Sequence, residues 1–160
     1  MSVLRATVYL VLILAAVLYV KLSLRTPLHP HNEIEIVQTH LGNLTDSILL
    51  EKLPVLVHDR IASAATLAAS HFRFLYLFEE PHPLSEYTAK VTSRFLILHN
   101  TSEELDLTVD IGSTPSNKIP VALRPHNALV LPAGTYFRTH SLETTNALRL
   151  NDITHRLFFK

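Results

Sequence analysis

Histidines are the residues of this chain most suited to chemistry, with ten among 160 residues. Two of them, His29 and His31, are one residue apart, and Glu35 follows closely. Alternate residues of a strand point to one face, and two imidazoles with a carboxylate suit Fe(II), Mn or Zn. His29, His31 and Glu35 are therefore candidate metal ligands, and the candidates for a further imidazole are His126 and His140.

A second short motif, Pro132-Ala133-Gly134, lies near the end of an apolar strand. The two segments together resemble the two motifs of the cupin family, through His29, His31, Glu35, Gly42, Pro132 and Gly134. The resemblance implies a jelly-roll-like sandwich and, with metal bound, an enzyme of the Fe(II) oxygenase type. However, Phe137 stands where the second motif has its metal-binding histidine, and His126 and Ser23 stand where the family has glycines. We therefore predict a sandwich without metal, cofactor or catalytic residues, and a metal-dependent enzyme as the alternative.

Other catalytic and nucleotide-binding patterns are missing from the sequence. The absence of cysteine excludes disulfides, cysteine-ligated zinc and a thiol nucleophile. Three glycines are too few for a phosphate-cradling loop. The motif G-x-S-x-G does not occur, so the sequence offers no nucleophile elbow. The pair His58-Asp59 resembles that of some phosphohydrolases, but a helix cap explains Asp59 better. Fourteen basic and fourteen acidic residues indicate no nucleic-acid partner.

Two sequons occur, at Asn43-Leu44-Thr45 and Asn100-Thr101-Ser102. Asn43 and Asn100 are acceptors for a glycan only in a secretory lumen. The structural alternative is a helix cap at the first sequon and a turn at the second.

The N-terminus carries an apolar run, Ala6–Val20, in which Thr7 is the only polar residue. Extended to Leu24, the run approaches the length of a membrane-spanning helix, because Lys21 can extend its ammonium to the headgroups. We predict a single-pass membrane anchor over residues 1–25, with the lipid bilayer as a partner. A cleaved signal peptide and a buried helix are the alternatives, and the residues before Lys21 make a poor cleavage site. The basic residues at both ends leave the orientation open.

The rest of the chain is predicted as a Pro/His linker over residues 26–32 and one β-rich domain over residues 33–160. The predicted class is mainly β (α+β), a sandwich or partial barrel with one or two short helices. The helices are expected from Asn43 or Thr45 to Lys52, and over Arg60–His71 with Asp59 as cap. Strands are expected at Glu33–Thr39, Pro54–His58, Phe72–Phe78, Ser93–His99, Leu105–Ile111, Ile119–Leu123, Ala128–Leu131, Thr135–Thr139, Leu148–Leu150 and Ile153–Phe159.

A further resemblance follows from the order of three segments: Leu53–Ile61, Phe72–Phe78 and Arg94–Ser102. The N-terminal anchor followed by these segments is similar to small membrane-anchored β proteins of large DNA viruses of algae and protists. The resemblance implies a virion membrane or minor capsid-associated component, located in the internal membrane of the virion or a host endomembrane.

The function predicted first is that of a non-enzymatic structural or interaction protein, with a capsid or coat protein as its partner. The alternatives are the membrane-tethered cupin-like metalloenzyme and a lumenal or exported glycoprotein domain. Co-assembly with a coat protein would favour the structural protein. Stoichiometric metal would favour the metalloenzyme, and a glycosidase-sensitive mass shift would favour the glycoprotein domain.

Overall fold

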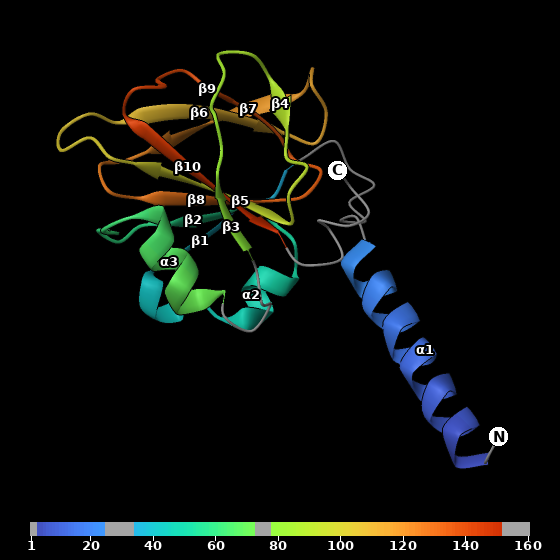
Figure 1. The fold of residues 1–160 in the computed structure, drawn as a ribbon. Coiled ribbons are helices and arrows are strands. Elements are labelled where there is room, and N and C mark those ends of the chain that lie inside the picture. The colour runs from blue at the N-terminus through green and yellow to red at the C-terminus, as the bar shows by residue number, and fades with distance from the viewer. Residues whose placement is uncertain (1–2, 25–33, 73–77, 152–160) are drawn as a thin grey trace.

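Two β sheets lie one above the other in the computed structural model, which describes residues 3–24, 34–72 and 78–151 (Figure 1). In the described chain, the first sheet has the strand order β1-β2-β8-β5-β10-β3 and the second β4-β9-β6-β7. The strands are β1 Val37–Thr39, β2 Val55–Val57, β3 Phe78–Pro81, β4 Ala89–Lys90, β5 Phe95–Asn100, β6 Leu107–Gly112, β7 Lys118–Leu123, β8 Ala128–Pro132, β9 Tyr136–Thr139 and β10 Thr145–Asn151. The predicted mainly β class with few short helices is confirmed.

Strand β8 joins the N-terminal strands to the rest of the first sheet. It pairs antiparallel with β2 on one side, where Val57 faces Ala128, and with β5 on the other, where His99 faces Ala128. Strand β1 then pairs parallel with β2. The ends of β1, β2 and β5 and the beginning of β8 therefore lie at one end of the sandwich, because antiparallel neighbours run in opposite directions.

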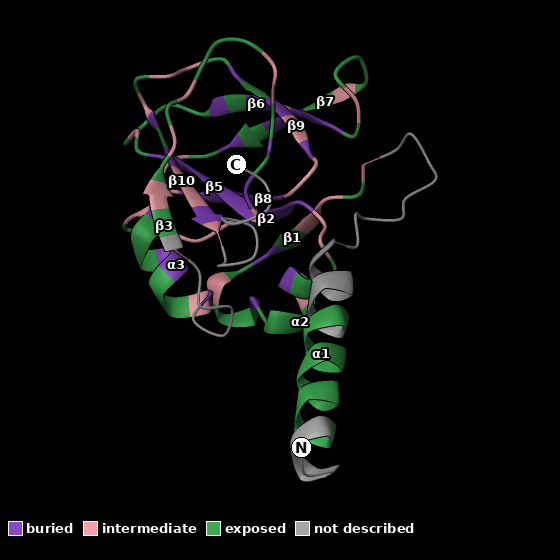
Figure 2. Ribbon diagram, turned by 45° about the vertical axis from the view of Figure 1, so that its right-hand side comes forward, coloured by how far each residue is buried: buried purple, intermediate pink, exposed green. Residues whose placement is uncertain are grey.

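Strands β5 and β8 bury side chains on both of their faces, as Figure 2 shows by their colour. Leu96, Leu98, Leu129 and Leu131 pack toward the second sheet, whereas the intervening Phe95, Ile97, Ala128 and Val130 pack in the cluster that contains helix residues. Burial on both faces explains why both strands are nearly continuous apolar runs in the sequence.

Two short helices cover the outer face of the first sheet, α2 Asp46–Leu50 and α3 Ala64–His71, and a 3-10 turn precedes them at Leu41–Asn43 (Figure 1). Leu49 and Leu67 are almost fully buried in the same cluster as Ile97. Helix α3 begins later than the predicted Arg60. The Ser63 hydroxyl accepts from the Thr66 N–H at 3.1 Å and so caps the helix in place of Asp59.

Most of the predicted strands overlap observed ones, with three differences. The strand predicted at Phe72–Phe78 corresponds to β3, which begins at Phe78, and residues 73–77 lie outside the described residues. The strand predicted at Ile153–Phe159 also lies outside them. Strand β4 was not predicted, because a strand of two residues has too short a pattern to detect.

Helix α1, Val3–Leu24, extends away from the sandwich and exposes apolar side chains from Val8 to Val17 (Figure 1). The predicted single-pass membrane localisation is contradicted, since no helix among the described residues combines the length and apolar character that a bilayer crossing requires. The physical reason lies in the short apolar run of Ala6–Val20, which contains the polar Thr7 and is bounded by Arg5 and Lys21. As a helix it spans only about 22 Å of a hydrocarbon core of about 30 Å. Most of the predicted linker, 26–32, lies outside the described residues.

Candidate functional site

A pocket of about 560 Å³ lies at the end of the sandwich where β1, β2 and β5 end and β8 begins. Four chain segments contribute to it. They are the residues after β1 and β2, the loop from β5 to β6, and the turn from β7 to β8, which supply His40, His58, Arg60, Glu103, Arg124, Pro125, His126 and Asn127. Every lining residue but Pro125 has a polar or charged side chain, so the pocket suits a polar ligand.

Asp59 organises one side of the pocket. Its carboxylate accepts from the backbone N–H of Leu41 and from Nδ1 of His40, the latter at 3.1 Å. The Leu41 N–H bond, followed by the His40 contact, holds the pKa of Asp59 below its ordinary value. The carboxylate is therefore ionised near neutral pH, and it fixes the segment after β1 against the segment after β2.

His58, the partner of Asp59 in the sequence, has a separate set of contacts. Its Nε2 lies 3.0 Å from the amide oxygen of Gln38, and the Asn127 amide lies 3.5 Å from Nδ1. Because an amide oxygen only accepts hydrogen bonds, Nε2 is the donor in the contact with Gln38. The His58-Asp59 pair thus holds together three segments, namely β1 with the residues after it, the residues after β2, and the turn before β8.

Glu103 organises the other side of the pocket. Its Oε2 lies 3.0 Å from Nε2 of His126 and 3.2 Å from a terminal guanidinium nitrogen of Arg60. The hydrogen bond from His126, and then the charges of His126 and Arg60, lower the pKa of Glu103. The side chains of Glu103 and Arg60 are 72% and 76% exposed, so water competes with this ion pair.

His126 holds its position through an unusual backbone conformation. Its φ is +61°, in the left-handed region that residues other than glycine rarely adopt. The Asn127 N–H donates to the Arg124 carbonyl, so residues 124–127 form a turn with Pro125 at its second position. The His126 N–H donates to the Asn100 carbonyl, which ties this turn to the end of β5. The imidazole is thereby directed to the Glu103 carboxylate from a rigid support.

Arg124 is the arginine of the pocket lining that pairs with no carboxylate of the described chain. No hydrogen bond or ion pair engages its guanidinium within residues 3–24, 34–72 and 78–151, although the residue is exposed beside His126. With Arg60, the lining carries two guanidinium groups and a single carboxylate, that of Glu103. Among the lining residues, guanidinium groups therefore outnumber carboxylates, while the Asp59 carboxylate, which is not a lining residue, contacts His40.

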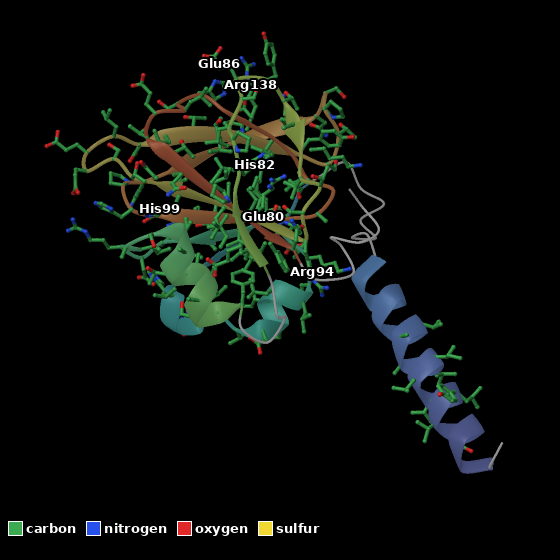
Figure 3. All side chains as sticks on the ribbon, viewed as in Figure 1. Glu80, His82, Glu86, Arg94, His99 and Arg138 are labelled. Atoms are coloured by element: carbon green, nitrogen blue, oxygen red, sulfur yellow. The ribbon has the colours of Figure 1, made fainter. Side chains whose placement is uncertain are left out.

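Two buried residues at the end of β5 hold the segments that line the pocket in place through hydrogen bonds. His99 is 2% exposed, and its Nε2 donates to the Ile61 carbonyl at 2.8 Å (Figure 3). Asn100 is fully buried, and its amide donates to the Leu105 and Leu123 carbonyls, both at 2.8 Å. These bonds join the end of β5 to its own following loop and to β7, so the loop that carries Glu103 is fixed at its base.

The structure does not bring the predicted metal candidates together. His29 and His31 lie outside the described residues, and Glu35 is exposed just before β1. His126 faces Glu103, while His140 contacts a different carboxylate, Asp110, at 2.8 Å. The described residues contain no group of three or more possible metal ligands.

The interior of the sandwich also differs from a metal centre. Phe137, at the position where the cupin motif has a histidine, is 2% exposed and packs among Val109, Leu98 and other apolar side chains. An apolar ring there supplies no metal ligand, so the described residues do not fit the metal that the cupin resemblance implies.

The two sequons have different surroundings. Asn43 is exposed at the end of the 3-10 turn. Asn100 is fully buried with its amide nitrogen hydrogen-bonded, and its Oδ1 accepts from the Ser102 N–H at 2.9 Å. This geometry favours the turn role for the second sequon, because a glycan on that nitrogen would have to replace two buried bonds.

Two lining residues stand out in the sequence, His126 as a candidate ligand and His58 in the His58-Asp59 pair, but the pocket itself was not predicted. His40, Arg60, Glu103 and Arg124 belong to no recognised motif, and each looks like an ordinary surface residue. The signal that was present is the set of turn residues, Asn100-Thr101-Ser102 and Pro125-His126-Asn127, which mark where the chain reverses. No known protein family, curated protein or solved structure matches the chain.

The buried His99 and the half-buried His82 make the stability of the sandwich dependent on pH. Burial, partly opposed by the Ile61 carbonyl, lowers the pKa of His99, and burial together with Arg149 lowers that of His82. The unfolded chain therefore binds more protons than the folded chain below about pH 6.5, and the free energy of unfolding falls as the pH drops through that range. Each histidine contributes at most about 1.4 kcal/mol per pH unit.

Urea unfolding followed by circular dichroism between pH 5 and 7.5 measures this effect. The His99→Gln variant keeps an N–H donor for the Ile61 carbonyl but cannot titrate, so its stability should fall less steeply with acid than that of the parent. The acidic groups Asp59 and Glu103 lose their contributions only at lower pH. Parallel pH profiles for the parent and His99→Gln would refute the assignment to His99.

Proposed function

We propose that this chain is a non-enzymatic interaction protein that binds an acidic segment of a partner protein in the pocket at the end of its sandwich. The observation that carries the proposal is the excess of guanidinium groups over carboxylates in the lining, where Arg124 pairs with no carboxylate of the described chain. Clustered guanidinium groups recognise carboxylates through charge-assisted hydrogen bonds. The partner class predicted from the sequence, a capsid or coat component, remains a prediction.

The jelly-roll interpretation of the sandwich belongs to the same proposal. It is supported by the strand orders β3-β10-β5-β8 and β4-β9-β6-β7, which divide eight consecutive strands between two sheets. In this arrangement β1 and β2 are additions to the first sheet. They bring His40 and His58 to the pocket, so the additions supply part of the proposed binding site.

Edge-strand pairing is a weaker route to a partner. The edge strand β7 contains Pro120, which has no N–H to offer, and the other edge strands β1, β3 and β4 have at most four residues. Short edges and proline are features that prevent pairing between sheets. This observation favours recognition through the pocket.

Binding of a labelled peptide tests the proposal. The purified full-length chain, kept in a mild detergent because α1 exposes apolar side chains, is titrated with a fluorescent peptide containing a run of glutamates. We expect saturable binding, measured by fluorescence anisotropy, which weakens at least about tenfold in Arg124→Ala, because a charge-assisted hydrogen bond contributes about 1.5–3 kcal/mol.

Two controls decide whether the pocket is responsible. Arg138→Ala removes an exposed arginine of β9 that is absent from the pocket lining and donates to the Glu86 carbonyl (Figure 3). This variant should bind the peptide as the parent does, and a peptide with glutamines in place of glutamates should not bind. Equal losses in Arg124→Ala and Arg138→Ala, or equal binding of the glutamine peptide, would show that the pocket does not recognise acidic groups.

A further inference from the structure

The Glu103 carboxylate shows how an anion is held in the pocket. A single oxygen, Oε2, receives both the His126 imidazole and the Arg60 guanidinium, at 3.0 and 3.2 Å. The two donors come from segments far apart in the sequence, and both reach the oxygen of a side chain that belongs to a third segment. The donors therefore define a position for an anionic oxygen that does not depend on Glu103 being the group that supplies it.

The contact is one that a ligand can displace. Glu103 lies in the exposed loop between β5 and β6, and its side chain is 72% exposed. Exposed ion pairs contribute between about 0 and 1 kcal/mol, so moving this carboxylate into water costs little. The loop is anchored below by Asn100 and Ser102, so the side chain can leave while the backbone stays in place.

Once the Glu103 carboxylate is displaced, the positive charge of the pocket lining matches a phosphate better than a carboxylate. Without Glu103 the lining presents the guanidiniums of Arg60 and Arg124, with the His126 imidazole as a further donor. A phosphate monoester carries about −1.5 to −2 charges at neutral pH and three acceptor oxygens, whereas a carboxylate carries one charge and two oxygens. Two guanidinium charges are therefore neutralised by one phosphate, but not by one carboxylate.

Resting on the proposed function, we propose that the pocket binds a phosphate monoester on the partner segment, such as phosphoserine, whose oxygens replace the Glu103 carboxylate at Arg60 and His126 and also contact Arg124. Glu103 then acts as an internal competitor that occupies the pocket when no phosphate is present.

Three labelled peptides that differ at one position test this inference on the full-length chain. The position carries serine, glutamate or phosphoserine in an otherwise neutral sequence, and anisotropy at pH 7 gives each dissociation constant. We expect the phosphoserine peptide to bind about tenfold more tightly than the glutamate peptide, because of its second charge and third oxygen. The serine peptide should not bind measurably.

Glu103→Gln tests the displacement itself. Removing the competing carboxylate should tighten phosphoserine binding by up to about fivefold, in line with an exposed ion pair of up to about 1 kcal/mol. The matched control is Glu104→Gln, which removes the same charge from the adjacent exposed residue, outside the pocket lining, and should leave the affinity unchanged.

The outcomes of these experiments distinguish the preference for phosphate from the recognition of acidic segments in general. Equal affinities for phosphoserine and glutamate would overturn the preference for phosphate and leave acidic recognition intact. An equal effect of Glu103→Gln and Glu104→Gln would overturn the displacement of Glu103. Failure of every acidic peptide to bind, with the run of glutamates included, would overturn the proposed function as well.

Discussion

Replacing Asn100 with alanine is expected to lower the free energy of unfolding by about 3 kcal/mol. The side chain is fully buried, and it makes three hydrogen bonds to backbone groups. The substitution leaves the carbonyls of Leu105 and Leu123 and the N–H of Ser102 without their partner. Because an unpaired buried polar group costs about 1–3 kcal/mol, the loss exceeds that of an ordinary hydrogen bond.

Chemical unfolding followed by circular dichroism measures this loss, and the sequence offers a matched control. Asn43→Ala makes the same change at the other sequon, where the side chain is exposed, and should alter the stability by less than about 0.5 kcal/mol. Similar stabilities for Asn100→Ala and Asn43→Ala would contradict the buried hydrogen-bond network at the end of β5.

The second large effect is expected from Leu98→Ala, also at about 3 kcal/mol. Leu98 is fully buried on the face of β5 that packs toward the second sheet, and its strand neighbours across β8 and β10 are Leu129 and Ala147. Strand β5 is hydrogen-bonded on both sides, so its backbone cannot move easily to fill the space. The variant therefore loses the transfer free energy of the side chain and also keeps a cavity.

Leu105→Ala is the control for the core substitution, because Leu105 is 64% exposed in the loop before β6. It removes the same atoms and should change the free energy of unfolding by less than about 1 kcal/mol. If Leu105→Ala destabilised the chain as much as Leu98→Ala, the two-sheet core described above would be wrong.

The strands could be predicted from the sequence because their patterns are local. Burial on both faces leaves a continuous apolar run at Phe95–Leu98 and at Ala128–Leu131. Asn100 marks the turn after the first run, and Asn127 and Pro132 flank the second. The start of α3 could not be predicted, because Asp59 and Ser63 are both acceptable caps in the sequence. The backbone N–H of Leu41, brought there by the pairing of β1 with β2, is what engages Asp59 instead.

The pocket could not be predicted because its parts meet only through sheet register. Arg60, Glu103 and Arg124 come together because β8 lies between β2 and β5, and nothing near any of the three residues encodes that arrangement. The helical pattern of the N-terminus was interpreted correctly as a helix, α1, and wrongly as a membrane crossing. Periodicity and composition report local conformation, whereas crossing a bilayer depends on the length of the uninterrupted apolar run.

The position of β8 also determines when the domain can fold during synthesis. Val57 of β2 and His99 of β5 both pair with Ala128 of β8, which lies between the two strands. Neither β2 nor β5 can therefore pair with β8 until β8 has left the ribosome. Pairings between distant segments are slow to form, and unpaired apolar strands aggregate readily. A nascent chain that ends before residue 128 therefore carries β2 and β5 without the strand that joins them, and we expect it to be prone to aggregation.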